Sequence, residues 1–216
     1  MADWPREHPQ WTHHRVIHTK HPPIDLFESP EHMLLGELES ATSDRAVHWH
    51  HFVNKADARF GPGWSPVMAA FCYGREARFN TGERGAYYAA DSVSTALREW
   101  AHHTARAWRQ FGFSQEVSAT VRCYTGVIVE PPVDVRGDTT VHDPDSYTAS
   151  QNLGARLTAA GEFGILYESV RDPGHEAVAL LRPPATTPVT QAGLYVLRWD
   201  GDQFIEYAYT EEFKTL

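Results

Sequence analysis

Residues 91–111 read DSVSTALREWAHHTARAWRQF, and their apolar side chains recur every three or four positions. The repeat consists of Val93, Ala96, Leu97, Trp100, Ala101, Thr104, Trp108 and Phe111. This spacing places the repeated side chains along one side of an α-helix. Either Asp91 or Ser92 stands where an N-cap residue would accept a hydrogen bond from a free backbone N–H. The segment therefore predicts one long amphipathic helix over about 91–111.

Strand-like segments dominate the sequence that follows this helix. They occupy residues 117–130, 164–169, 176–182, 192–199 and 203–209. Asp172-Pro173-Gly174 and Asp200-Gly201-Asp202 have the composition of turns between such segments. No internal repeat or low-complexity tract interrupts the chain. The sequence thus predicts a single α+β domain over residues 1–216, in which one main helix crosses a curved antiparallel or mixed sheet.

The sequence before the helix predicts shorter elements. Residues 14–19 alternate in the manner of a strand, which we expect at an edge of the sheet, and a proline pair ends it. Leu and Met within 31–45 have the spacing of a short helix. Residues 47–66 are rich in His, Trp and Gly and predict a long loop. Apolar runs at 68–73 and 86–90 indicate two short strands on either side of a turn.

Composition and charge restrict the class of protein. With 42% hydrophobic and 22% charged residues, a chain of 216 residues can bury a core without disulfides or metals. No apolar run is long enough to span a membrane, so no membrane partner is expected. A net charge of −9 disfavours the basic surface that contact with nucleic-acid phosphates requires, so no direct nucleic-acid partner is expected. A local basic pocket for a small phosphorylated ligand stays compatible with this charge.

The first residues and the cysteines bear on the cellular compartment. Residues 1–30 lack the apolar core and the small-residue cleavage site of a secretory signal peptide, so a cytoplasmic location is expected. Cys72 and Cys123 are too few and too far apart for a disulfide framework or a zinc site. Each lies in an apolar segment, which predicts buried, reduced thiols.

Histidines cluster along the chain without the spacing of metal ligands. His48, His50 and His51 are close in sequence, as are His102 and His103. No Cys, Asp or Glu stands at a recognisable partner spacing, and adjacent side chains on a helix diverge by about 100°. We therefore expect no metal site. Signatures of Rossmann dinucleotide binding, P-loop NTP hydrolysis, zinc metalloproteases and serine hydrolases are also absent.

Four positions carry side chains suited to chemistry, and each also has an ordinary structural explanation. Arg78 stands in a turn, where an arginine is usually solvated. Tyr87 and Tyr88 are adjacent on a strand, where one ring faces the core and the other faces outward. Glu99 is on the side of the helix opposite the apolar stripe, so it faces either solvent or a ligand. Ser169 ends a strand-like segment, and the residues alone leave these alternatives open.

These residues fall within segments that resemble the conserved blocks of the RES domain family. The segments are Ala77–Gly82, Ala86–Ala89, Ser94–Glu99, Ser150–Gly154 with Phe163–Arg171, and Arg15-Val16. In this order they resemble the family's arginine, tyrosine, glutamate and serine blocks and its N-terminal arginine strand. The resemblance covers about residues 14–182. It departs at 36–66, a His-, Trp- and Gly-rich insertion, and at 173–176, where many members have Gly and Asn.

The resemblance implies a fold like that of the ADP-ribosyltransferases, with NAD as substrate and no bound cofactor. It also implies a toxin that is neutralised by an antitoxin partner with a DNA-binding helical domain. The expected activity is cleavage of NAD at the nicotinamide–ribose bond, by water or with inorganic phosphate as co-substrate. The alternatives are ADP-ribose transfer to a protein, or an idle module that binds a nucleotide or a partner through Trp49 and Trp64, exposed in the insertion. A homo-oligomer is compatible with each of these.

The resemblance also assigns roles to the arginine, tyrosine and glutamate blocks. Glu99 is expected to accept a hydrogen bond from a ribose hydroxyl and to oppose the positive charge that develops on the ribose. Arg78 would fork onto the pyrophosphate as a bidentate donor. Tyr88, or Tyr87 if the strand has the other phase, would stack on the nicotinamide or the ribose.

Three further residues receive weaker assignments. Ser169 would donate a hydrogen bond to a phosphate oxygen or to the attacking nucleophile. Arg15 and Asn152 are candidates for phosphate contacts, with a purely structural role as the alternative for each.

Overall fold

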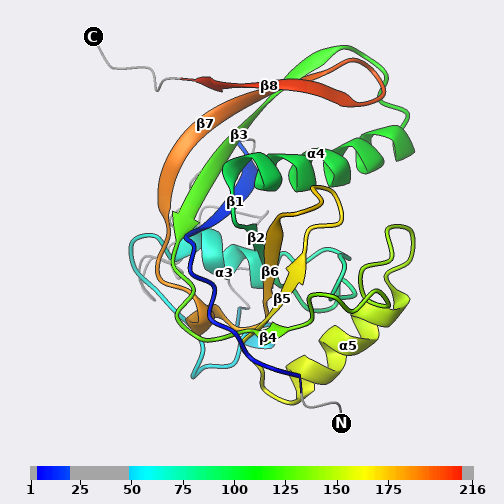
Figure 1. Cartoon of the computed structure of the whole chain (residues 1–216). Helices are drawn as coiled ribbons and strands as arrows, with labels where there is room; N and C mark the ends of the chain where they lie inside the picture. The colour runs from blue at the N-terminus through cyan, green and yellow to red at the C-terminus, as the bar shows by residue number, and fades with distance from the viewer. Residues whose placement is uncertain (1–3, 20–48, 211–216) are drawn as a thin grey trace.

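Eight strands form one mixed sheet in the computed structural model, which describes residues 4–19 and 49–210. The strands are β1 (His13–His18), β2 (Tyr87–Ala90), β3 (Val117–Gly126), β4 (Val133–Asp134), β5 (Gly164–Glu168), β6 (Glu176–Leu180), β7 (Thr190–Trp199) and β8 (Phe204–Thr210). Their order across the sheet is β4-β5-β6-β2-β1-β3-β7-β8 (Figure 1). Neighbours are antiparallel except β4 and β5, which are parallel. The fold is α+β, as predicted.

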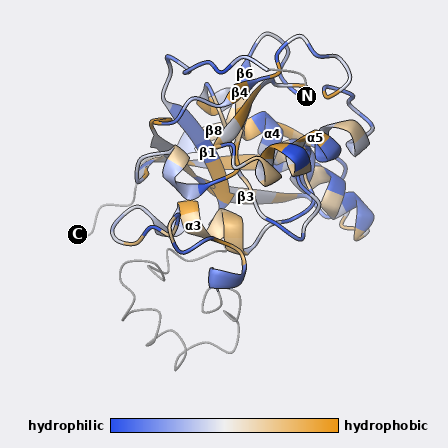
Figure 2. Ribbon diagram, turned by 90° about the horizontal axis from the view of Figure 1, so that it is seen from below, coloured by the Kyte–Doolittle hydropathy of each residue, from blue (hydrophilic) through white to orange (hydrophobic). Residues whose placement is uncertain are grey.

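Three α-helices of the described chain pack on the two faces of this sheet. They are α3 (Ser65–Cys72), α4 (Val93–Gln110) and α5 (Thr148–Ala159), and the short 3-10 helices η1 (Trp49–His51) and η2 (Pro183–Ala185) lie in connecting segments. Helix α3 packs against one face, and α4 and α5 pack against the other. In Figure 2, α3 has mostly hydrophobic colours, whereas α4 and α5 alternate between hydrophobic and hydrophilic residues, as helices with one exposed side do.

Helix α4 confirms the long amphipathic helix predicted from the sequence. Ser92 is its N-cap, and the Ser92 Oγ accepts a hydrogen bond of 3.1 Å from the Thr95 backbone N–H. Leu97 is buried in a cluster that includes Val16 of β1 and Val121 of β3. The apolar stripe of the helix therefore covers the half of the sheet that contains β1, β3 and β7.

The sheet opens between β1 and β2, and this opening positions the site. The two strands pair at His14 and Ala90, whereas β1 pairs with β3 along its whole length. Beyond His14 the first strand leaves the backbone of β2 unpaired on that side. There the Arg15 Nη1 donates a hydrogen bond of 2.9 Å to the carbonyl oxygen of Tyr88. One arginine thus bridges the gap between the two halves of the sheet.

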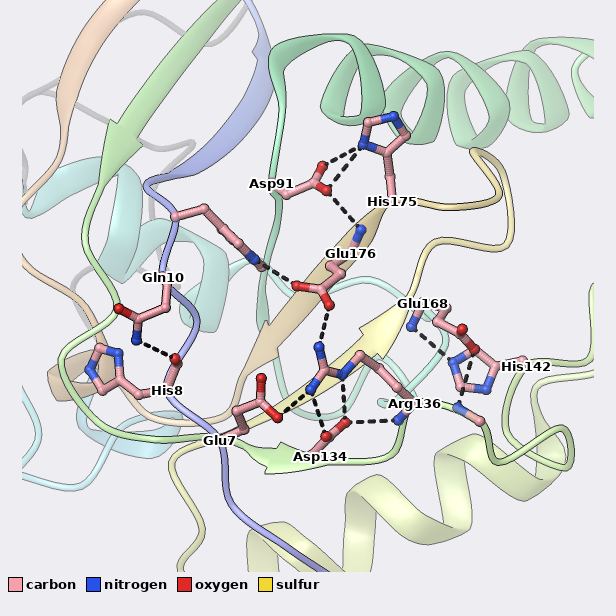
Figure 3. Close-up of polar contacts among 12 residues, drawn as sticks. Glu7, His8, Gln10, Asp91, Asp134, Arg136, His142, Glu168, His175 and Glu176 are labelled. Atoms are coloured by element: carbon pink, nitrogen blue, oxygen red, sulfur yellow. Dashed lines mark hydrogen bonds and ion pairs between the residues drawn. The ribbon is translucent and has the colours of Figure 1, made fainter.

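The N-terminal segment is held against the sheet by Arg136, which lies among three carboxylates (Figure 3). Its Nη2 lies 2.5 Å from Glu7 and 2.8 Å from Asp134, and its Nη1 bonds to Glu176 at the start of β6. The hydrogen bond with Asp134, together with the other two carboxylates, raises the pKa of Arg136 above its ordinary value. The ion pairs of Arg136 therefore connect the N-terminal segment at Glu7 to β4 and to the start of β6.

The prediction that residues 14–19 form an edge strand is wrong in its position. A strand does form there, but β1 lies between β2 and β3 in the interior of the sheet. Its first residue, His13, is fully buried beside Tyr87, since β2 and β3 flank the strand on its two sides. The His13 Nε2 lies 2.7 Å from the Thr186 hydroxyl, which partners this buried imidazole.

Residues 68–73 belong to a helix and not to the predicted strand. They fall within or next to α3, where Pro66 occupies the first turn and the backbone is helical. A short apolar run fits a buried strand and a buried helix equally well, and only length and flanking residues distinguish them. Helix α5 was likewise not predicted, since one main helix was expected. The strands predicted after α4 are confirmed as β3, β5, β6, β7 and β8.

The insertion at 36–66 is described from residue 49 onward, and the helix predicted at 31–45 lies outside the described residues. Trp49 and Trp64 are partly buried against the core cluster on the α3 face. The prediction that both are exposed is therefore wrong. Each indole ring contributes to the core of this face instead of presenting a free surface.

Candidate active site

The candidate site lies on the face of the sheet that α4 and α5 share. One apolar cluster joins α4 to β1, β3 and β7, and a second joins α5 to β5 and β6. Tyr88 of β2 packs against the second cluster, while Ala90 of the same strand belongs to the first. The site therefore lies where the two clusters meet, next to the opening between β1 and β2.

Glu99 points from α4 toward the segment that follows β5. Its Oε1 accepts a hydrogen bond of 2.7 Å from the hydroxyl of Ser169, and its Oε2 lies 3.9 Å from the His103 Nε2. The side chain is 24% exposed. Glu99 is therefore not a fully solvated helix residue, because Ser169 holds one of its carboxylate oxygens.

Ser169 is held in a fixed orientation. The residue is 2% exposed and follows the last residue of β5. Its Oγ accepts a hydrogen bond of 3.1 Å from the Asp172 backbone N–H. Because this N–H approaches the hydroxyl oxygen, the hydroxyl hydrogen is directed to the Glu99 carboxylate.

Tyr88 and Tyr87 occupy opposite faces of β2, as side chains on a strand alternate. Tyr87 is fully buried on the α3 face, and its hydroxyl has no hydrogen-bond partner among the described residues. The Tyr88 hydroxyl donates to the Asn80 Oδ1 at 2.7 Å and accepts from the Phe79 N–H at 2.9 Å. Burial raises the pKa of Tyr88 above its ordinary value. Tyr88 thus presents an uncharged ring to the candidate site, and its hydroxyl is already hydrogen-bonded to Asn80 and Phe79.

Arg78 is buried, 7% exposed, and is not the solvated turn residue that its sequence context suggested. Its Nη1 donates to the carbonyl oxygens of Val141 at 3.0 Å and Asp143 at 2.9 Å, and its guanidinium lies 4.9 Å from the ring centre of Tyr147. No hydrogen bond from its Nε or Nη2 reaches a described residue. The Nε and Nη2 edge of the guanidinium is therefore available to a ligand.

A glycine lets α5 approach the turn that carries Arg78. A Cβ built on Gly154 would lie 2.0 Å from the carbonyl oxygen of Phe79, closer than any side chain could be accommodated. The neighbouring Gln151 donates to the carbonyl oxygen of Ala77 at 3.2 Å. Helix α5 therefore fixes the backbone on both sides of Arg78.

Tyr167 of β5 brings the three sequence-predicted side chains into one electrostatic neighbourhood. Burial raises its pKa well above the ordinary value, and the charge of Glu99 and the nearby Tyr88 raise it further, whereas Arg78 lowers it. Direct contacts give the same neighbourhood: the Tyr88 hydroxyl accepts from the N–H of Phe79, the residue after Arg78, and the Phe79 ring lies 4.9 Å from that of Tyr167. Two residues after Tyr167, Ser169 donates to Glu99. These contacts connect Arg78, Tyr88 and Glu99, which come from separate parts of the sequence.

His103 lies beside Glu99 in a strongly positive environment. Partial burial, together with the charges of Arg171, Arg106 and Arg78, lowers its pKa from 6.5 to about 4. The imidazole is therefore neutral at pH 7, so its contact with Glu99 is not an ion pair at that pH. The positive charges of Arg171, Arg106 and Arg78, which all act on His103, give this region a local basic character that suits a phosphorylated ligand.

The segment 169–175 is attached to the start of α4 at two points. The Thr95 hydroxyl donates to the Asp172 carboxylate at 2.8 Å. The His175 Nδ1 lies 3.1 Å from Asp91, which also accepts the backbone N–H of the next residue (Figure 3). The segment that carries the site serine is therefore fixed by contacts on both sides.

Arg15 and Asn152, the two weaker candidates for phosphate contacts, differ in their surroundings. Besides its bond to the Tyr88 carbonyl, the guanidinium of Arg15 lies 4.7 Å from the ring centre of Tyr87, and burial lowers its pKa. Arg15 thus lies at the opening of the sheet against Tyr87, on the α3 face and not on the face that carries the candidate site. Asn152 is exposed on α5, and the structure places its neighbour Gln151, not Asn152 itself, against the site.

Sequence reasoning missed several residues of the site. They are Asn80, His103, Tyr147, Tyr167 and Asp172. Some signals were present, because Asn80 follows Arg78 in the same turn and Asp172 begins the predicted Asp-Pro-Gly turn. Tyr147 and Tyr167 carry no local signal, since each acquires its place only through the tertiary fold.

Metal-binding clusters and membrane-spanning helices are absent from the part of the chain that the structure describes. No group of three or more His, Cys, Asp or Glu side chains is arranged there to hold a metal ion. None of its helices has the length and apolar character needed to cross a membrane. Cys72 and Cys123 are buried and form no disulfide, as predicted.

Comparison with known proteins gives a family match over most of the chain. The family model described as "RES domain" matches residues 49–200. Among solved structures, a chain from the crystal structure of the M. tuberculosis MbcT–MbcA toxin–antitoxin complex is similar, with 13% sequence identity and a TM-score of 0.42. That similarity covers 95% of this chain and 86% of the other. No curated protein matches.

Proposed function

Because this chain belongs to the RES domain family, we propose that it cleaves NAD at the nicotinamide–ribose bond and serves as the toxin of a toxin–antitoxin pair. The observation that carries the proposal is the hydrogen bond of 2.7 Å from the Ser169 hydroxyl to Glu99. It fixes a carboxylate next to the segment of Tyr167, whose ring packs against Phe79, the neighbour of Arg78 and a hydrogen-bond partner of Tyr88. Bond cleavage in NAD needs these three functions: a negative charge, a group that holds pyrophosphate and a ring that holds nicotinamide.

Glu99 supplies the negative charge. When the glycosidic bond breaks, its electron pair leaves with the nicotinamide, which becomes neutral, and positive charge develops on the ribose. Ser169 engages one oxygen of Glu99, so the other oxygen can accept a hydrogen bond from a ribose hydroxyl and oppose this charge. A carboxylate that is already oriented stabilises the transition state without further rearrangement.

Arg78 supplies the pyrophosphate contact. Its Nη1 is anchored to the carbonyl oxygens of Val141 and Asp143. The Nε and Nη2 groups remain for a bidentate contact with phosphate oxygens, and each such charge-assisted bond contributes roughly 1.5–3 kcal/mol. The guanidinium is preorganised, because its anchored edge prevents it from turning toward solvent.

Tyr88 supplies an aromatic surface. Its hydroxyl is engaged by Asn80 and Phe79, so it contributes to binding through its ring and not through its hydroxyl. Because its hydroxyl both donates and accepts a hydrogen bond, the Tyr88 ring is already fixed. It therefore loses little conformational entropy when the nicotinamide or the ribose stacks on it.

The attacking group determines the product. The Ser169 hydroxyl accepts one hydrogen bond and donates one to Glu99, and in this proposal it orients the carboxylate while the nucleophile comes from outside the chain. Attack by water yields ADP-ribose, attack by inorganic phosphate yields ADP-ribose 1″-phosphate, and attack by a protein side chain yields an ADP-ribosylated target. Mass spectrometry of the product distinguishes the three.

The experiment is to incubate the purified protein with NAD, with and without inorganic phosphate, and to measure free nicotinamide. We expect NAD to be consumed and nicotinamide released, and Glu99→Gln to abolish most of this release. Glu116→Gln is the matched control, because Glu116 is exposed and lies outside the site. Full retention of NAD by the wild-type protein at micromolar concentration, under both conditions, contradicts the proposal.

The toxin role has its own test. Expression of the wild-type chain is expected to arrest growth and to lower cellular NAD, whereas the Glu99→Gln variant is tolerated. Co-expression of the adjacent gene product is expected to restore growth if that product is the antitoxin. Normal growth and normal NAD in cells that make the folded wild-type protein without a partner would count against a toxin.

The idle binding module is the weaker alternative. It depended on exposed tryptophans in the insertion, and Trp49 and Trp64 are instead partly buried against the core.

A further inference from the structure

A chain of hydrogen bonds connects the first turn of α4 to Glu99 through Asp172. The hydroxyls of Ser92 and Thr95 lie 2.7 Å apart, and the Thr95 hydroxyl lies 2.8 Å from the Asp172 carboxylate. The Asp172 backbone N–H reaches the Ser169 Oγ at 3.1 Å, and the Ser169 hydroxyl reaches Glu99 at 2.7 Å. Four contacts thus lead from the N-cap of the helix to the proposed catalytic carboxylate.

The chemistry of the groups fixes the direction of every hydrogen in this chain. An ionised carboxylate only accepts, so the single hydroxyl hydrogen of Thr95 goes to Asp172. The hydrogen between Ser92 and Thr95 must then come from Ser92. At the other end a backbone N–H only donates, so Ser169 accepts from Asp172 and has its own hydrogen free for Glu99. No alternative arrangement satisfies all four contacts, and such chains reinforce each bond in turn.

Asp172 is suited to hold this arrangement because it is itself held from two directions. The residue is 8% exposed, and besides the Thr95 hydroxyl its carboxylate lies 3.2 Å from the Arg98 Nη1. It also lies at the first turn of α4, where the helix dipole favours a negative charge. The side chain therefore fixes the backbone at residue 172, and with it the N–H that orients Ser169.

We propose that Asp172 is a positioning residue for Glu99 and acts through Ser169. This inference rests on the proposed NAD cleavage, and it adds Asp172, a residue without a role in the sequence analysis or in the family resemblance. Asp172 contacts no reacting atom. Its effect is to keep the Ser169 hydroxyl directed at Glu99, so that the other carboxylate oxygen is presented to the ribose.

Thr95→Val is the informative variant, because replacing the nearly buried Asp172 itself could unfold the segment. Valine has the shape of threonine but cannot donate to Asp172. We expect kcat for nicotinamide release to fall about tenfold with KM for NAD within about twofold, since ground-state contacts are kept. Thr95→Ser restores the hydroxyl and is expected to restore turnover. Thr104→Val, the same substitution on the same helix, is the control and is expected to behave as wild type.

A double-mutant cycle tests whether the effect passes through Ser169. In a Ser169→Ala background, Thr95→Val is expected to cause no further loss of turnover, because the hydroxyl that it orients is gone. Equal losses from Thr95→Val in both backgrounds would show that Thr95 and Asp172 act by another route. That result, or wild-type turnover in folded Thr95→Val, overturns the proposal.

A spectroscopic measurement separates this proposal from the proposed function. The carboxyl carbon of Glu99 is observed by NMR in 13C-labelled wild-type protein and in the variants, without NAD. Thr95→Val is expected to shift this signal in the same direction as Ser169→Ala, and Thr104→Val is expected to leave it unchanged. If the wild type does not cleave NAD, the proposed function fails, and this signal alone decides whether Asp172 positions Glu99. An unmoved Glu99 signal in Thr95→Val overturns the positioning role whatever the activity.

Discussion

The Ser169 hydroxyl donates to the Glu99 Oε1 over 2.7 Å, although 70 residues separate the two in the sequence. Ser169 follows β5 and Glu99 belongs to α4, two elements that meet only because β5 and β1 are parts of one sheet. The contact determines which carboxylate oxygen is engaged and which is free. The chemistry proposed for this protein depends on that distinction.

Ser169→Ala is expected to lower kcat about tenfold to hundredfold. A hydrogen bond to a charged group is worth roughly 1.5–3 kcal/mol, and its loss lets Glu99 rotate away from the ribose. KM for NAD is expected to change little, because Ser169 does not touch the substrate in the proposed mechanism. Nicotinamide release measured beside Ser118→Ala, an exposed control, tests this. Unaltered turnover in Ser169→Ala would remove the serine from the mechanism.

Tyr88→Phe is expected to lower stability while NAD affinity stays within about twofold. The change removes the hydroxyl that bonds to Asn80 and Phe79, at a cost of about 1–2 kcal/mol, but keeps the ring. Tyr88→Ala removes the ring and is expected to weaken NAD binding. Urea unfolding and calorimetric titration measure the two quantities.

Tyr87→Phe is the matched control for this pair. The Tyr87 hydroxyl has no partner among the described residues and lies on the other face of the sheet, so its removal should not lower stability. A larger loss of NAD affinity in Tyr87→Phe than in Tyr88→Phe would reverse the assignment of the two tyrosines.

The sequence was most informative where one local pattern determines the structure. Helix α4 follows from its apolar period and its serine N-cap, and the later strands follow from alternation and turns. The pattern failed at α3, where eight residues from Ser65 to Cys72 are too short to show a period. It also failed for the position of β1, because the burial of His13 depends on Tyr87 and Thr186 from distant strands and loops.

The candidate site was predictable in its residues but not in its connections. Strand alternation required that one of Tyr87 and Tyr88 face the site, but the phase of β2 was fixed only by its pairing with β6. Helix periodicity placed Glu99 away from the apolar stripe without revealing Ser169 opposite it. Asp172 looked like a turn residue and is one, yet its carboxylate also meets Thr95, a contact that no local rule predicts.

Acid is expected to destabilise the protein through His13. Burial, followed by the charges of His14 and Arg15, lowers the pKa of His13 from 6.5 to about 3. Between these values the unfolded chain binds a proton that the folded chain rejects, so stability falls as the pH falls from about 6.5 toward 3. One such group contributes a slope of up to about 1.4 kcal/mol per pH unit.

Urea unfolding at several pH values between 4 and 7 measures this slope. His13→Gln keeps a hydrogen-bonding side chain but cannot take up the proton. The number of protons taken up on unfolding, which sets the slope, is therefore expected to fall by about one. His8→Gln, at an exposed position, is the control and should leave the slope unchanged. An identical slope in wild type and His13→Gln would mean that other groups govern the acid response.

Arg78 and Glu99 are expected to divide substrate binding from catalysis. Glu99 opposes charge that appears only in the transition state, so Glu99→Gln is expected to lower kcat a hundredfold or more, about 2.7 kcal/mol, with nearly unchanged NAD affinity. Arg78 contacts the pyrophosphate in the ground state, so Arg78→Ala is expected to weaken NAD binding strongly.

Arg78 also has a structural task, since its Nη1 holds the carbonyl oxygens of Val141 and Asp143. Arg78→Lys therefore accompanies Arg78→Ala, because it keeps the positive charge and loses only the bidentate geometry. Arg156→Ala, exposed on α5, is the control for loss of an arginine. Calorimetric titration of NAD gives Kd for each folded variant, and single-turnover assays give the rate of bond cleavage. If Arg78→Lys binds NAD as the wild type does, charge alone suffices and the forked contact is wrong, and if Glu99→Gln turns over normally, the glutamate has no catalytic role.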